Sequence, residues 1–91
     1  MSAIAVAIIL PLWSGMDESE IRRIQSNIAG GQLPNVDCLV TWYHSGRGEL
    51  CGVCARRILS TEPAIECDVP GGTTVWFHVP CHARWQEARE R

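Results

Sequence analysis

The chain has 91 residues, with ten acids against eight basic residues, all of them arginine, and a formal net charge of −2. That length allows one small domain with a marginal core, which a metal, disulfides or a partner often supplements. Apolar residues make up 46% of the chain and charged residues 20%, which argues against disorder. The slightly acidic balance argues against nucleic-acid binding by bulk charge, and the chain is short for most enzyme folds.

The N-terminal segment, residues 1–16, contains an uninterrupted apolar run, AIAVAIIL at 3–10, which Pro11 ends. The run predicts a buried strand, paired within the chain or with a second copy in a dimer. The alternatives are a peripheral membrane or partner anchor, and translation that starts at Met16 instead of Met1. The run is shorter than the roughly 20 residues that a membrane span needs, and it lacks the charged start and cleavage site of a signal peptide.

Residues 17–50 are expected to form a helix followed by a connector. Asp17 can cap a helix over 17–29, whose isoleucines repeat at helical spacing, and Gly30 and Gly31 end it. The connector, 32–50, includes apolar and aromatic residues at 39–43 that suggest a short strand. Its SGRGE segment lacks the Lys-Ser/Thr ending of a phosphate-binding loop.

Residues 51–91 have the pattern of a small zinc-finger module. ARRIL at 55–59 suggests a strand, and period-two alternation at 64–69 and 73–79 predicts a hairpin that turns at Pro70-Gly71-Gly72. Pro80 is well placed to open a terminal helix. The predicted fold class is therefore small α+β: a knuckle, a β-hairpin and a C-terminal helix, with an N-terminal strand and an amphipathic helix.

Two paired motifs predict a metal site, because Cys51-x-x-Cys54 is followed by His78-x-x-Cys81 across the predicted hairpin. Thiolate and imidazole are the ligands that structural Zn²⁺ prefers, and four of them close its tetrahedron. We therefore expect one structural zinc at these residues, and no catalytic zinc and no enzyme activity. A redox-active CxxC is the less favoured alternative, since a thioredoxin-like motif opens a long helix.

The remaining cysteines and histidines are expected to lie outside the site. His82 is the rival to His78, but as the helical neighbour of Cys81 it should point elsewhere. Cys67 is expected to be a small apolar core residue, and Cys38 not to be a ligand. Because five cysteines cannot all pair, and no signal peptide is evident, a reducing cytoplasm is the predicted location.

The segments CGVC, ARRI, AIECDV and TTVWFHVPCHARW resemble a single LIM-type or related treble-clef zinc finger. Residues 17–91 are also similar to small uncharacterised proteobacterial proteins, through Gly31–Pro34, Gly46–Gly48, the cysteine pair and Phe77–Cys81 with Trp85. The second zinc half of a LIM domain is missing, so the resemblance implies a fold and a metal and no particular partner.

The expected function is that of a non-catalytic zinc-binding interaction module with a protein partner. Four tryptophans is a high number for this length, and exposed tryptophans often anchor interfaces. Trp42, Tyr43, Trp76 and Trp85 are the candidate anchors, with Trp85 favoured as core. The alternative is a nucleic-acid-binding or transcription-related finger, whose contacts would be Arg56, Arg57, Arg84, Arg89 and Arg91.

Overall fold

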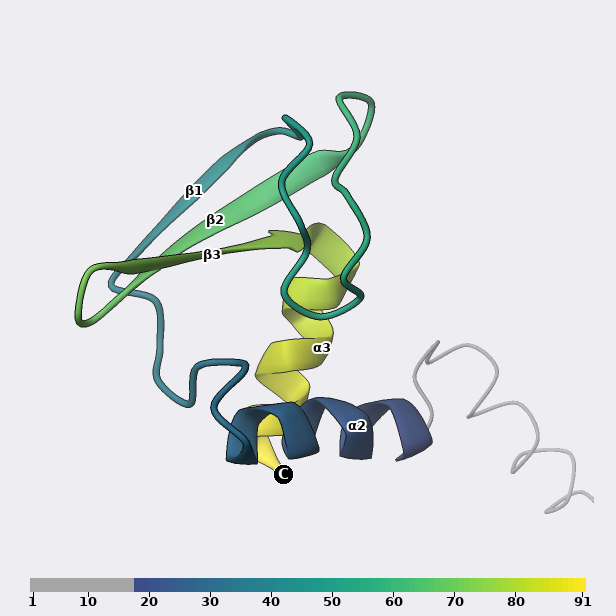
Figure 1. Ribbon diagram of the computed structural model, residues 1–91, viewed down its shortest axis with the longest axis vertical. Helices are drawn as coiled ribbons and strands as arrows, with labels where there is room; N and C mark the ends of the chain where they lie inside the picture. The colour runs from purple at the N-terminus through teal and green to yellow at the C-terminus, as the bar shows by residue number, and fades with distance from the viewer. Residues whose placement is uncertain (1–17) are drawn as a thin grey trace, which may run out of the picture.

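The computed structural model describes residues 18–91, which form two helices and a three-stranded antiparallel sheet (Figure 1). In chain order the elements are α2 (Glu18–Ala29), β1 (Val40–Ser45), β2 (Pro63–Val69), β3 (Thr73–His78) and α3 (Val79–Glu90). The small α+β class is confirmed. The predicted strand at 3–10 and the alternative start at Met16 lie outside the described residues. No helix in the described part is both long and apolar enough to cross a membrane.

The hairpin of β2 and β3 is confirmed, and its register follows from the alternation in the sequence. Ile65 faces Phe77 across the pair, and both are buried on the inner face of the sheet. The turn needs a left-handed backbone at Gly71 and Gly72, with φ of 97° and 85°, which glycine adopts without strain.

A third strand, β1, pairs with the outer side of β2. Tyr43 lies opposite Ile65, so the sheet order is β1-β2-β3. The short strand expected near residues 39–43 is therefore confirmed. The strand expected at 55–59 is wrong: the segment forms one isolated bridge, between Leu50 and Arg57, and is not part of a strand. The chain curls there because Ala55, with φ of 62°, has a left-handed conformation that interrupts an extended run.

The core lies between the inner face of the sheet and the two helices. α3 runs from the end of β3 down to α2, as Figure 1 shows. Trp85 of α3 is fully buried, stacks on Phe77 with ring centroids 5.0 Å apart, and donates its indole N–H to the Pro34 carbonyl at 3.0 Å. The isoleucine face of α2 is confirmed, since Ile21 and Ile24 are buried.

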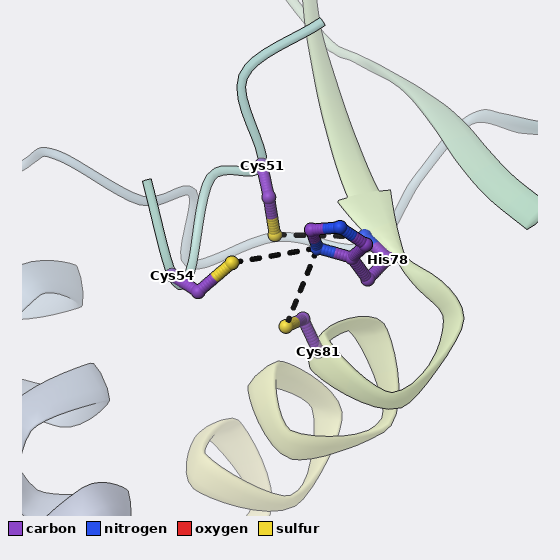
Figure 2. A group of neighbouring side chains, drawn as sticks. All are labelled: Cys51, Cys54, His78 and Cys81. Atoms are coloured by element: carbon purple, nitrogen blue, oxygen red, sulfur yellow. Dashed lines mark hydrogen bonds between the residues drawn. The ribbon is translucent and has the colours of Figure 1, made fainter. Parts of the chain in front are cut away.

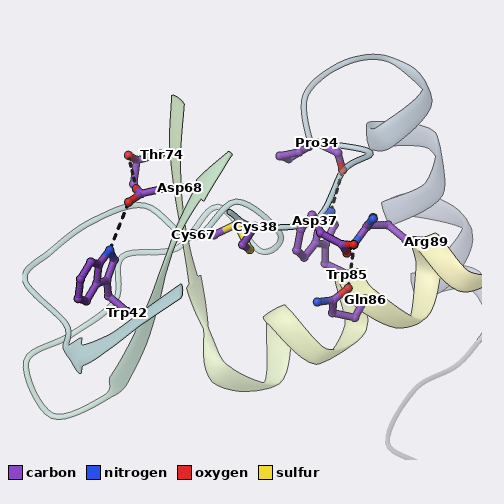
Figure 3. The surroundings of a disulfide bond; sticks show 10 residues. All are labelled: Pro34, Asp37, Cys38, Trp42, Cys67, Asp68, Thr74, Trp85, Gln86 and Arg89. Carbon is purple, nitrogen blue, oxygen red and sulfur yellow. Dashed lines mark hydrogen bonds and ion pairs between the residues drawn. A yellow bond between two sulfur atoms is a disulfide. The ribbon is translucent and has the colours of Figure 1, made fainter. Parts of the chain in front are cut away.

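Cys67 is buried on the inner face of β2, as expected, but it is not a free thiol. It forms a disulfide with Cys38, which lies just before β1 (Figure 3). The core position expected for Cys67 is therefore confirmed, but the disulfide was not predicted. The pairing depends on the β1–β2 register, which places Thr41 opposite Cys67 and so brings the preceding segment close. Three cysteines remain free, and these are Cys51, Cys54 and Cys81.

Candidate metal centre

The first cysteine pair lies on a tight turn that docks against β3. Cys51 forms a bridge with Trp76, and the Gly52 amide donates to the Trp76 carbonyl at 2.8 Å. The turn closes where the Ala55 amide donates to the Cys51 carbonyl at 3.0 Å. Gly52 is required by this close approach, because a Cβ there would lie 2.8 Å from a methyl carbon of Val75. Both sulfur atoms are thereby held against the end of the hairpin.

The second pair lies where β3 passes into α3. His78 ends the strand with an extended backbone, and Cys81 lies in the first turn of the helix, next to Pro80. Thiolates are favoured at such positions, because the first amides of a helix carry partial positive charge. The strand-to-helix junction thus points an imidazole and a sulfur at the turn that carries Cys51 and Cys54.

The structure brings these four side chains together, and their ligand atoms all lie within 4.8 Å of one another (Figure 2). The Nδ1 atom of His78 lies 3.4 Å from the sulfur of Cys54 and 4.0 Å from that of Cys81. Tetrahedral Zn–S and Zn–N bonds of about 2.3 and 2.0 Å would put such atoms roughly 3.6 Å apart. The cluster could therefore hold one metal ion with small movements of side chains.

The hydrogen-bonding environment shifts the pKa values of Cys51 and Cys81 in opposite directions. The hydrogen bond from the Cys81 thiol, together with backbone amides, holds the pKa of Cys51 well below its ordinary value. The same hydrogen bond and the neighbouring thiolate charge raise the pKa of Cys81. Burial lowers the pKa of His78, but hydrogen bonding and the nearby thiolates raise it more, so the net shift is upward. Because cysteine binds a metal as the thiolate, a cation in the cluster would take the place of the thiol protons.

Glu62 supports the ring of His78 from behind. Its Oε1 atom lies 3.1 Å from Nε2 of His78 and also accepts the Leu59 amide at 2.8 Å. An imidazole that binds metal through one nitrogen commonly donates its other N–H to a carboxylate, which fixes ring orientation. Sequence analysis did not find this residue, because nothing in its spacing connects it to the four clustered residues.

His82 lies away from the cluster, in agreement with the choice of His78. Its ring packs edge-on against Phe77 at 5.4 Å and beside Trp85 at 5.6 Å. Burial in this aromatic setting lowers the pKa of His82. The helical position next to Cys81 therefore points the imidazole into the core.

The predicted arginine patch divides into two groups. Arg89 pairs with Asp37 at 2.8 Å, and Arg91 pairs with Glu18 and Glu87, so the end of α3 is neutralised. The other three arginines line a groove beside the metal centre, together with Leu59, Glu62, Pro63, His78, Pro80 and Cys81. No continuous five-arginine face therefore exists.

Comparison with known proteins adds no assignment to this geometry: no family model, curated protein or solved structure matches the chain.

Proposed function

We propose that the clustered residues bind one Zn²⁺ and that this zinc is structural. The observation that supports the proposal is a set of three sulfurs and one imidazole nitrogen within 4.8 Å of one another. Thiolate-rich sets of four protein ligands are typical of structural zinc, whereas catalytic zinc keeps a position open for water. With three thiolates and a neutral imidazole, the centre carries a charge of −1, which makes it a weak Lewis acid. We therefore propose no catalytic role.

Native mass spectrometry of the full chain, produced in zinc-supplemented medium, tests the metal. We expect one zinc per chain. The His78→Asn variant should lose this zinc, whereas the matched His82→Asn variant should retain it. Substitution with Co²⁺ should give the visible spectrum of a tetrahedral thiolate site. Only metal-free protein, or equal loss from both histidine variants, would contradict the assignment.

We infer that the module is a treble-clef-type finger, from the order of its parts. A cysteine turn, the β2–β3 hairpin and the junction into α3 follow one another, and the four clustered side chains close them on one point. The resemblance to single LIM-like fingers of small proteobacterial proteins agrees with this order. The role of such a compact centre is to hold irregular backbone in place for binding.

We propose that β1 is the surface for a protein partner, either another protein or a second copy of this chain. It is an edge strand, and within residues 18–91 no strand pairs with its outer side. Trp42 and Tyr43 point to opposite faces of the sheet, yet both are exposed, by 55% and 72%. Trp76 is half-buried and Trp85 is fully buried, so we propose Trp42 and Tyr43 as the anchors.

Trp42 is held in place before any partner arrives. Its indole N–H donates to a carboxylate oxygen of Asp68 at 3.2 Å, and the other oxygen of Asp68 accepts the Thr74 hydroxyl at 2.9 Å (Figure 3). An anchor already fixed in one rotamer loses less entropy on binding. A photo-crosslinking residue in place of Tyr43 should capture a discrete product in the native cell, which Trp42→Ala abolishes. The control is the same probe in place of Arg22, which lies on the exposed face of α2.

The compartment depends on the redox state of Cys38 and Cys67. A reduced cytoplasm, our sequence-based prediction, suits the three metal-binding thiols, whereas the disulfide is typical of an oxidising compartment. Acid quenching of native cells followed by thiol alkylation shows whether Cys38 and Cys67 are reduced or form the disulfide in the cell. We propose the cytoplasm if Cys38 is alkylated and an oxidising compartment if it is protected.

A further inference from the structure

A groove of about 680 Å³ lies next to the metal centre and has a mixed lining. Its walls come from the loop between β1 and β2 and from the start of α3. Leu59, Pro63 and Pro80 supply an apolar floor, and all three are exposed. Such a surface can take an apolar side chain from an extended segment of a partner.

Three arginines surround this floor, and their positive charge is only partly balanced. Arg84 contacts Glu20 at 3.3 Å, whereas Arg57 donates only to the Gly48 carbonyl, at 2.6 Å. Arg56 lies near the sulfur of Cys54 and near Glu62, and the attraction to both raises the pKa of Arg56. Neither Arg56 nor Arg57 has a carboxylate partner within ion-pair distance in residues 18–91.

The one carboxylate of the groove is already engaged. Glu62 accepts from the Leu59 amide and from His78, and these contacts lower the pKa of Glu62. Its charge acts on the imidazole, the backbone and Arg56, so Arg57 is the groove arginine that has no carboxylate nearby within residues 18–91. An anionic ligand with an apolar side chain is therefore the complement of this lining.

We propose that the groove binds an acidic peptide segment of a partner protein. The carboxylates of the segment would pair with Arg57 and Arg84, whose planar forks match carboxylate geometry, while an apolar side chain covers the leucine and prolines. The proposal rests on the proposed interaction module and adds a contact surface other than β1, with the chemical class of the segment that binds there. It also gives the metal a purpose, since His78 and Cys81 line the groove and Arg56, which also lines it, directly follows the cysteine turn.

An acidic peptide fits the groove better than nucleic acid does. Single-stranded nucleic acid is held by aromatic side chains that stack on bases, and no aromatic ring other than the His78 imidazole lines this groove. The other two arginines of the predicted patch are neutralised at the far end of α3.

The test is fluorescence anisotropy with the zinc-loaded full chain and a labelled hexapeptide in which each leucine follows two glutamates. We expect the peptide to bind saturably. A peptide in which glutamines replace the glutamates should bind about tenfold more weakly. Arg57→Gln should weaken binding about fivefold, and the double variant with Arg84→Gln more. Leu59→Ser tests the apolar contact separately and should also weaken binding several-fold.

The control is Arg22→Gln, which removes the same charge from the exposed face of α2, outside the groove. Equal weakening by this variant, equal binding of the glutamine peptide, or tighter binding of a labelled oligothymidine would overturn the proposal. Native mass spectrometry of each sample reports the zinc independently. One bound zinc without peptide binding refutes the groove assignment alone, whereas absence of zinc refutes the proposed function.

Discussion

Replacement of Glu62 by glutamine is expected to weaken zinc binding without removing any ligand. Glutamine retains an oxygen that can accept the Leu59 amide at 2.8 Å, so the turn that carries the side chain should persist. The substitution removes the negative charge 3.1 Å from Nε2 of His78. That charge orients the imidazole ring and makes its Nδ1 atom a stronger ligand for a metal ion. The variant therefore isolates the electrostatic part of this support.

The magnitude follows from the burial of the pair. Loss of such carboxylate support commonly costs about 10- to 100-fold in metal affinity. The His78 side chain is 13% exposed but that of Glu62 is 40% exposed, so water screens part of the interaction. We therefore expect the lower end of this range, a loss of about tenfold in zinc affinity.

Competition for Zn²⁺ with a chromophoric chelator measures this effect, and the Co²⁺ spectrum checks that the ligand set is unchanged. Glu66→Gln is the matched control, because Glu66 lies 3.4 Å from His44, which is not a member of the cluster. Equal zinc affinities for the two variants and the unaltered chain would refute the reasoning. A changed Co²⁺ spectrum for Glu62→Gln would show that the turn itself had moved.

Three further predictions concern the metal, the cysteine turn and the N-terminal segment. Cys54→Ser should abolish zinc binding and unfold residues 51–91 by circular dichroism, since structural zinc supplies on the order of 10 kcal/mol of folding free energy; an unchanged melt would contradict this. Ala55→Gly should stabilise the zinc-loaded protein by about 0.5–1 kcal/mol in urea, because alanine is strained at φ of 62°; no gain would show that the strain is relieved elsewhere. A chain that starts at Met16 should be less soluble than the full chain, or should have a different oligomeric mass in light scattering. The reason is that burial of each large apolar residue at 3–10 contributes about 1.5–3 kcal/mol. Identical behaviour of the two chains would support the later start.

The elements predicted correctly are those that local signals determine. The acidic start and double-glycine end of α2, the alternation of β2 and β3, and proline at the start of α3 all act within a few residues. The proximity of Cys51, Cys54, His78 and Cys81 belongs to the same class. Their two short spacings already put each pair on one turn, and only the hairpin had to bring the pairs together.

The features that sequence analysis missed depend on contacts between distant segments. The Cys38–Cys67 disulfide spans 29 positions and requires β1 to pair with β2, for which no local pattern exists. The support by Glu62 requires the loop after Leu59 to fold back over His78. The strand predicted at 55–59 is absent for a local reason, the left-handed backbone of Ala55. Alanine rarely adopts this conformation, so the sequence gives no sign of it.

The disulfide and the metal are expected to act on one another through folding, although they lie apart. Cys67 is near one end of β2, whereas Ala64, near the other end, pairs with His78. If the metal-free sheet is unfolded, zinc binding includes the free energy of folding the whole sheet, to which the disulfide contributes.

Closing a loop of 29 residues stabilises the folded state by about 3.6 kcal/mol. Cys38→Ala, which keeps the buried Cys67 sulfur, should therefore weaken zinc binding by at least tenfold and at most about 400-fold. Chelator competition on the oxidised chain and this variant measures the ratio, with Ser60→Ala, on the exposed loop, as the control. Equal affinities would show that zinc folds only its own loop, and that the sheet stands without it.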